Sequence, residues 1–375
     1  MKILIGGPYV YKDQKILGGV EAVLKNLKHG INLYEPDINL KIVSGSDQAQ
    51  AKIEVDNDIT YIQHPKLKFG SIFLSSYPYR VKNFLKKSNF DVLNDHSEDF
   101  SYYILKMQDK LLYTLHGMPW GEKKYLSKYK QPFYHQFYVK RLEKILKNLR
   151  YFVSINPYSK EIVKNKTSAI IYEICNPIPD ELFKLKNQKN ENRMLYIGVI
   201  SRRKNLFTLV RSLSLVKKEI KDFKLVIAGN ISNKEYFDEI INYIKKNNLT
   251  ENIEYLGKIT EEQKYQEFSK MNFLILPSFQ ETAPMVISEA FAAGKPVIGS
   301  NVCGIPYMLN NEKNGLLVDP IDEKDISSKI LYLLENPEKT HSMGINGKKY
   351  AQKYHCLKMV ADKYRKAYEE IMARS

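Results

Sequence analysis

The chain has 375 residues, 43% of them hydrophobic, and a formal net charge of +16 with three cysteines. This length exceeds the size at which one hydrophobic core usually keeps growing, so two domains are expected. The hydrophobic fraction excludes a disordered chain, and no apolar run approaches the roughly 20 residues that span a bilayer. Scattered cysteines and the lack of an apolar leader predict a reduced, cytoplasmic protein.

Short strands alternate with helices through the first half of the chain. Strands are expected at 2–5, 41–44, 59–63, 91–93, 111–115 and 151–155, and helices at 19–30, 77–87, 101–108 and in the stretch up to 150. Asn156 followed by Pro157 predicts an N-cap and the start of another helix. This alternation favours a mainly parallel sheet with helices on both faces.

The same pattern restarts after residue 192. Strands are expected at 194–197, 224–228, 253–256, 272–276 and 296–299, helices at 205–220, 234–247, 261–270 and 284–293, and two closing helices with a break near His355. We therefore expect an α/β protein with Rossmann-like domains at 1–177 and 193–355 facing each other across a cleft. A polar hinge at 178–192 joins them, and a helix at 356–375 packs back toward the first domain. Ligands of such sheets bind beyond the carboxyl ends of the strands.

The positive charge allows two interpretations. It can attract an anionic partner such as a nucleotide diphosphate, a lipid phosphate or an anionic membrane surface, or it can reflect a general abundance of lysine. Segment 122–150 interleaves nine Lys and Arg residues with six aromatic ones. Such a segment can lie on a membrane or form the solvated face of a packed helix, and both readings stay open. Diffuse charge without a recognisable motif argues against nucleic acid as a partner.

Glu281 and Glu289 are separated by seven residues, the first in a loop and the second in the helix that follows. The amides of Met285 and Val286 fall in the first turn of that helix, where free N–H groups and the helix dipole suit a diphosphate. Glu289 lies about a turn deeper, where a carboxylate can accept hydrogen bonds from ribose, and Glu281 can hold sugar hydroxyls. The spacing alone would equally fit two solvated glutamates.

These residues and others, in the same order along almost the whole chain, resemble the retaining glycosyltransferases of family four, also described as glycosyl transferases group one. The matching segments are Gly18-Gly19-Val20-Glu21, 91–96, Leu115-His116-Gly117, Asn176-Pro177, Ile197-Gly198 with Arg203-Lys204-Asn205, the two glutamates with 292–298, and 314–318. The resemblance implies a GT-B fold in which 1–177 binds the acceptor and 193–355 binds the nucleotide-sugar donor. It also implies retention of anomeric configuration without a metal.

By this resemblance His116 and Glu281 are the catalytic residues that contact the transferred sugar. The donor-binding residues would be Gly18, Gly19, Arg203, Lys204, Ala283, Pro284, Met285, Val286 and Glu289, with His96 and Glu21 on the acceptor side. Lys204, expected to open a helix, would neutralise charge as the nucleotide leaves. No cofactor is expected. The substrates would be a UDP- or GDP-linked sugar and a saccharide or lipid-linked acceptor, in surface or cell-envelope polysaccharide synthesis.

Some positions depart from the family pattern. Val199 stands where the family usually has an arginine, so catalysis depends on whether Arg202 or Arg203 reaches the same place. The triplet 282–284 and Tyr307 also differ, which affects the identity of the sugar more than the fold. The alternative function is a catalytically weak module that binds nucleotide sugar or a membrane. The Asp-x-Asp spacing at 56–58, a metal motif in another glycosyltransferase fold, reads better as a turn.

Overall fold

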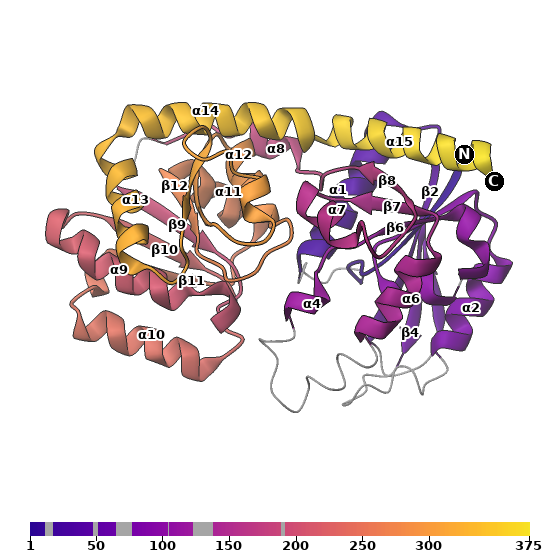
Figure 1. Cartoon of the computed structure of the whole chain (residues 1–375), viewed down its shortest axis with the longest axis horizontal. Coiled ribbons are helices and arrows are strands. Elements are labelled where there is room, and N and C mark those ends of the chain that lie inside the picture. Colours follow the sequence, from indigo (N-terminus) through magenta and orange to yellow (C-terminus); the bar gives the residue numbers. More distant parts are fainter. Residues whose placement is uncertain (12–17, 48–51, 65–76, 104, 123–137, 189–191) are drawn as a thin grey trace. The chain divides into compact units, whose positions relative to one another are not determined.

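The computed structural model describes residues 1–11, 18–47, 52–64, 77–103, 105–122, 138–188 and 192–375. The chain divides into two compact units, coloured along the sequence in Figure 1. Unit 1 comprises Met1–Pro177 and Cys356–Ser375, and unit 2 comprises Ile178–His355. Each unit is built on one mainly parallel sheet, which confirms the predicted α/β class.

The sheet of unit 1 has the strand order β3-β4-β2-β1-β5-β6-β7-β8, and only β3 pairs antiparallel. Its strands are β1 (Lys2–Gly6), β2 (Asn39–Asp47), β3 (Ile53–Asp56), β4 (Ile59–His64), β5 (Val92–Asp95), β6 (Leu111–Thr114), β7 (Tyr151–Ser154) and β8 (Ile170–Glu173). Asn57 joins β3 to β4 with a positive φ of 52°, so the Asp-x-Asp segment is a hairpin turn as predicted. The edge strands β3 and β8 were not predicted, because both are partly exposed and lack a buried apolar run.

Helices cover both faces of this sheet. They are α1 (Gly19–Tyr34), α2 (Tyr77–Lys87), α3 (Glu98–Tyr103), α4 (Pro119–Glu122), α6 (Lys140–Asn148), α7 (Pro157–Val163) and α15 (Leu357–Arg374). Helices α2, α3, α6 and α7 share one hydrophobic core with the sheet, and α1 packs against α15. Asn156 caps α7 as predicted, accepting a hydrogen bond from the Ser159 amide at 2.9 Å.

Two predicted helices of unit 1 need correction. The helix expected at 101–108 is wrong in extent, because α3 ends at Tyr103 and a separate 3₁₀ helix, Leu105–Lys110, follows with a non-helical Met107. Of the long stretch up to 150, α6 forms the final part, while 123–137 lie outside the described residues. The membrane reading of segment 122–150 therefore stays a prediction. No helix in the described part of the chain is long and apolar enough to cross a membrane.

Unit 2 contains a six-stranded, fully parallel sheet in the order β11-β10-β9-β12-β13-β14. The strands are β9 (Arg193–Ile197), β10 (Lys224–Ala228), β11 (Ile253–Gly257), β12 (Phe273–Leu276), β13 (Val297–Ser300) and β14 (Gly315–Val318). The helices are α8 (Asp180–Phe183), α9 (Leu206–Glu219), α10 (Lys234–Lys246), α11 (Glu261–Lys270), α12 (Met285–Ala292), α13 (Glu323–Glu335) and α14 (Pro337–Tyr354). Met194 and Tyr196 on β9 pack with α9, α10 and α13, whereas Leu195 packs with α8, α11 and α12.

Several features of unit 2 differ from the sequence prediction. Residues 178–192 were expected to be polar, but Ile178 and Leu182 are fully buried in the core of unit 2, and the role of this segment as a hinge stays a prediction. Lys204 does not open a helix: it ends a 3₁₀ turn, and Asn205 with a positive φ of 54° separates it from α9. The late turn at 314–318 contains strand β14, and α13 is an additional closing helix. The predicted break near His355 is confirmed between α14 and α15.

The C-terminal helix α15 belongs to unit 1. Its buried residues include Leu357, whose backbone and side chain approach Gly30 of α1. The Asn94 amide donates a hydrogen bond to the Tyr368 hydroxyl at 2.8 Å, and Arg365 makes a bidentate pair with Asp37 at 2.7 and 2.8 Å. These contacts connect α15 to α1 and to the central strand β5.

Candidate functional site

Each sheet has one point where the strand order reverses direction. In unit 2 it lies between β9 and β12, and in unit 1 between β1 and β5. The loops that follow two such neighbouring parallel strands diverge and leave room for a ligand. The candidate residues of unit 2 lie in the loops after β9 and β12 and in α12, and those of unit 1 follow β1, β5 and β6.

The loops after β9 and β12 are connected by a buried ion pair. The Lys204 ammonium contacts Glu281 Oε1, and Arg203 Nη1 lies 3.9 Å from Glu281 Oε2. The side chain of Glu281 is only 9% exposed. Arg203 also donates a hydrogen bond to the Gln280 carbonyl at 2.8 Å, and the Gly304 amide donates one to the Glu281 carbonyl at 2.9 Å. The predicted Arg203, Lys204 and Glu281 thus form one cluster with a fixed carboxylate.

Helix α12 begins directly after this loop. Pro284 is its N-cap, so Met285 and Val286 are its first two residues, as predicted. The first amides of a helix have no intrahelical acceptor, and they carry the positive end of the helix dipole. Ala283, Met285 and Val286 remain partly exposed, which leaves this helix start accessible to an anion.

Glu289, one turn into α12, has a partner that sequence reasoning missed. Lys264 Nζ lies 2.8 Å from Glu289 Oε1 and 3.1 Å from Glu261 Oε1. The side chains of Lys264 and Glu289 are 14% and 8% exposed. Burial acts to lower the pKa of Lys264, but the charges of Glu289 and Glu261 outweigh it and raise the pKa above its usual value. Lys264 is therefore a stable cation beside Glu289.

The backbone is closely packed where the loops that follow β9 and β10 meet. A Cβ on Gly229, whose φ is +150°, would lie 1.9 Å from the Gly198 carbonyl oxygen, so only glycine fits there. The fully buried Tyr196 hydroxyl has no hydrogen-bond partner among the described residues, and burial raises its pKa well above its usual value. Glu281 adds to this shift, which places Tyr196 near the charged cluster.

Val199 is 42% exposed after β9 and carries no charge. Of the two arginines considered in its place, Arg202 pairs with Glu239 at 2.7 Å and stacks over Tyr236. Arg203 instead faces the loop that carries Glu281. Among these residues, Arg203 is therefore the arginine that joins the charged cluster.

In unit 1, His96 and His116 form a pair at the carboxyl ends of β5 and β6. His96 Nδ1 lies 2.8 Å from His116 Nε2, and the rings stack at 5.1 Å. Burial lowers the pKa of His116 to about 4, and burial followed by the charge of His116 lowers the pKa of His96 well below its usual range. Both rings are therefore neutral near pH 7, and one N–H is shared between them. The buried Nε2 of His96 has no hydrogen-bond partner among the described residues.

The predicted glycine loop lies at the start of α1. Gly18 is the N-cap and Gly19 is the first residue, and no atom of a described residue lies within 4 Å of a Cβ built on either glycine. The Glu21 carboxylate accepts a hydrogen bond from the Gly18 amide at 3.2 Å. Glu21 thus stabilises the first turn of α1. This role was not part of the prediction, which placed Glu21 on the acceptor side.

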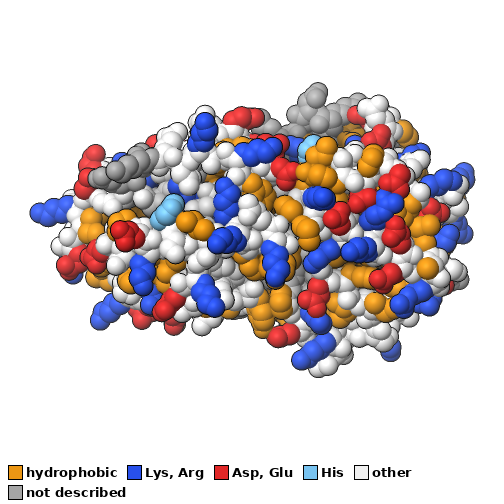
Figure 2. All heavy atoms as spheres, turned by 90° about the horizontal axis from the view of Figure 1, so that it is seen from above, with side chains coloured by type: hydrophobic (Ala, Val, Ile, Leu, Met, Phe, Trp, Pro, Cys, Tyr) orange, Lys and Arg blue, Asp and Glu red, His pale blue; other side chains and the backbone are white. Residues whose placement is uncertain are grey.

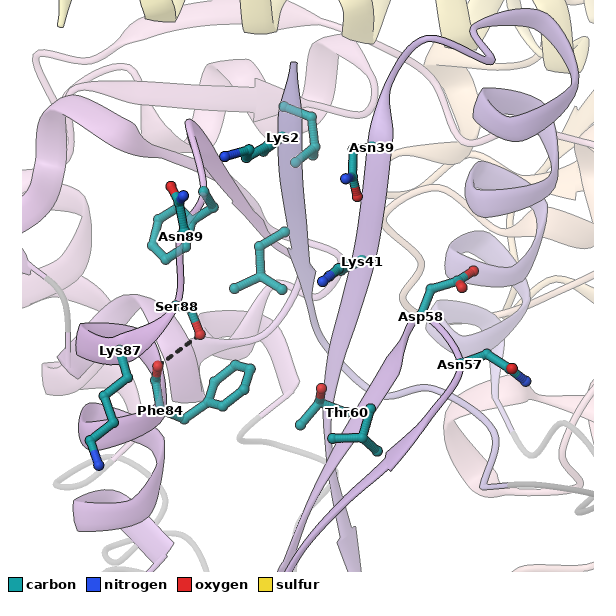
Figure 3. Close-up of a pocket in the computed structure, with 14 residues that line it drawn as sticks. Lys2, Asn39, Lys41, Asn57, Asp58, Thr60, Phe84, Lys87, Ser88 and Asn89 are labelled. Atoms are coloured by element: carbon teal, nitrogen blue, oxygen red, sulfur yellow. Dashed lines mark hydrogen bonds between the residues drawn. The ribbon is translucent and has the colours of Figure 1, made fainter.

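Two pockets lie near the amino ends of the strands, opposite the carboxyl ends that carry the candidate residues. The first, of about 470 Å³, is lined by Lys2 and Asn39 at the amino ends of β1 and β2 and by Phe84 and Lys87 of α2 (Figure 3). The second, of about 490 Å³, includes Asn272 and Pro296, which precede β12 and β13. Neither contains a predicted site residue. On the face drawn in Figure 2, Lys and Arg side chains are mixed with acidic and hydrophobic ones rather than gathered in one patch.

Comparisons with known proteins agree with this arrangement. Residues 177–350 match the family model described as "Glycosyl transferases group 1". An uncharacterized glycosyltransferase of Methanocaldococcus jannaschii is 27% identical over 378 residues, covering 99% of each chain. The capsular polysaccharide biosynthesis glycosyltransferase CapM of Staphylococcus aureus is 24% identical over 241 residues, 62% of each chain.

Solved structures show the same fold over the whole length. Sucrose-phosphate synthase from Thermosynechococcus elongatus superimposes with a TM-score of 0.82 at 20% identity, covering 100% of both chains. Anabaena HepE in complex with UDP and glucose gives a TM-score of 0.75 at 15% identity, covering 98% of this chain and 99% of HepE. The predicted GT-B fold is confirmed, and the sequence relatives that the chain resembles are glycosyltransferases. The family match is confined to residues 177–350, which lie almost entirely in unit 2.

Proposed function

We propose that this chain is a retaining glycosyltransferase of family four that moves a sugar from a nucleotide diphosphate to a saccharide or lipid-linked acceptor. The observation that carries the proposal is the two buried ion pairs, Lys204–Glu281 and Lys264–Glu289, whose carboxylates lie in the loop before α12 and in α12 itself. HepE structures with UDP and with UDP-glucose support this class of donor. The similarity to CapM supports a role in surface polysaccharide synthesis.

The proposed donor site assigns one task to each group. The amides of Met285 and Val286, with Lys204 and Arg203, hold the diphosphate, because cations and helix starts stabilise phosphate charge. Glu289 accepts hydrogen bonds from ribose, and Glu281 from hydroxyls of the sugar. Lys204 and Glu281 contact each other, so in this proposal donor binding separates them, with the ammonium turning to phosphate and the carboxylate to the sugar.

The proposed reaction proceeds with retention. The acceptor hydroxyl attacks the anomeric carbon on the face from which the diphosphate leaves, and its proton passes to the departing phosphate oxygen. The bond from the anomeric carbon to that oxygen breaks as the new glycosidic bond forms. The protein contributes position and charge, with neutral His116 beside the transferred sugar and Gly18 and Gly19 near the diphosphate. The proposal assigns no metal and no cofactor, and acceptor-side roles of His96 and Glu21 stay predictions.

A panel of nucleotide sugars tests this proposal. The purified chain is screened by thermal shift with UDP- and GDP-linked sugars, and products formed with the best donor are analysed by NMR. We expect sugars linked to one of the two nucleotides, UDP or GDP, to raise the Tm of the protein. Transfer should continue in EDTA, and the product should retain the anomeric configuration of the donor. Binding without hydrolysis or transfer would instead favour a nucleotide-sugar-binding module, and no shift with any nucleotide would overturn the proposal.

A further inference from the structure

Lys264 forms an ion pair with Glu289, although it comes from a different helix. It lies in the first turn of α11, and its ammonium bridges Glu289 at 2.8 Å and Glu261 at 3.1 Å. Glu261 is 43% exposed, whereas the Glu289 side chain is 8% exposed. A buried carboxylate is costly without a cation, so Lys264 compensates the charge of Glu289 and fixes its orientation.

The pair leaves one donor and one acceptor unused. Lys264 contacts Oε1 of Glu289, and no described residue donates a hydrogen bond to Oε2. An ammonium has three N–H donors, and two of those on Lys264 point to Glu289 and Glu261. One carboxylate oxygen and one ammonium proton therefore remain next to each other. Two vicinal hydroxyl groups match this arrangement, one donating to Oε2 and the other accepting from Lys264.

We propose that Lys264 and Glu289 together form a subsite for the cis-diol of the donor ribose, and that Lys264 determines selectivity for ribonucleotides over deoxyribonucleotides. This inference rests on the proposed function, because Glu289 is assigned there to ribose. A site built to hydrogen-bond a hydroxyl rejects an analogue without it, since the site's own polar groups are then left unpaired. If Lys264 were purely structural, its replacement would not change the preference for ribonucleotides over deoxyribonucleotides.

The experiment compares a nucleoside diphosphate with its 2′-deoxy and 3′-deoxy forms by calorimetric titration of the full chain. The base is the one that binds best in the panel above. For the wild type we expect each deoxy form to bind about 10- to 100-fold more weakly. For K264M we expect about tenfold weaker binding of the ribonucleotide, and all three ligands within about threefold of each other. K264Q is measured in parallel, so that the result does not depend on the folding of one variant.

K270M is the matched control. Lys270 is on the same helix and pairs with Glu267 at 3.2 Å, so this variant also loses an ion pair but should keep the wild-type affinities. Wild-type discrimination retained in K264M or K264Q would overturn the inference and leave Lys264 a structural residue. A wild type that binds all three ligands equally would also overturn it while the proposed function stands. Failure of every nucleoside diphosphate to bind would remove the proposed function itself.

Discussion

Glu281 illustrates how the surroundings of one side chain determine its chemistry. With only 9% of its side chain exposed, this carboxylate depends on Lys204, while Arg203 is more distant at 3.9 Å. Removing one partner of a buried pair leaves an uncompensated charge, which costs about 3–5 kcal/mol. The same lysine is proposed to hold phosphate when the donor is bound. Its loss therefore affects both the free protein and the reaction.

Lys204→Met should reduce kcat/KM by about 100-fold or more, because the departing diphosphate loses a neutralising charge. Initial rates with the donor found in the panel measure this effect. Arg202→Met is the control from the same turn, since Arg202 pairs with the exposed Glu239, and it should stay within about threefold of wild type. Equal losses in the two variants would argue against a specific role for Lys204.

At the residue scale the sequence predicted both members of the Lys204–Glu281 pair, but only Glu289 of the Lys264–Glu289 pair. Glu281, Glu289 and the helix start between them could be predicted because they are close in sequence. Lys264 could not, because it lies 25 residues before Glu289 on a helix whose packing the motif does not reveal. One signal was available: Lys264 is four residues before the fully buried Phe268, so it lies on the apolar face of α11.

At the scale of elements, strands made of buried apolar residues, such as β10 and β12, could be predicted within a residue or two. β8 could not, because its residues are only partly buried and give no clear period. The order of the strands in each sheet could not be predicted from local sequence patterns either. It depends on long-range pairing, which places β9 beside β12.

Helix α14 packs against the end of α12 through two glycines. A Cβ on Gly344 would lie 2.2 Å from the Gly294 carbonyl oxygen, and one on Gly347 would lie 2.6 Å from the Phe291 ring. Because backbone atoms cannot move aside easily, close approach here requires glycine. This contact connects the turn after α12 to the closing helix of unit 2.

Gly344→Ala should therefore destabilise unit 2 by about 1–3 kcal/mol, although the same change in an exposed helix would stabilise it by up to about 1 kcal/mol. Differential scanning calorimetry measures the shift in Tm. Ser342→Ala, at an exposed position on the same helix, should leave Tm nearly unchanged. A Tm at or above the wild-type value for Gly344→Ala would contradict the packing described.

At the scale of the whole molecule, the two units should differ in their response to acid because the His96–His116 pair lies in unit 1. The folded-state pKa of His116 is about 4, below the usual value of 6.5. Between these values the unfolded chain binds more protons than the folded one, so stability is complete above pH 6.5 and falls as the pH approaches 4. Over this pH range the shift of His116 corresponds to a loss of stability of about 3 kcal/mol.

His116→Gln should flatten this dependence between pH 6.5 and 4. The single tryptophan, Trp120, lies in unit 1, so its fluorescence during urea unfolding follows that unit. His341→Gln, an exposed histidine in unit 2, is the control and should leave the pH dependence unchanged. A pH dependence of His116→Gln equal to that of wild type would show that this pair is not responsible.

The return of α15 to unit 1 has a consequence for the order in which the protein forms during synthesis. Unit 2 is one continuous segment, Ile178–His355, and can complete its core as soon as it has left the ribosome. Most of unit 1 is translated before unit 2, but α15 is not available until residues 356–375 are translated, so the face of α1 around Gly30 stays uncovered until then. The half that is synthesised first is thus the half that finishes folding last.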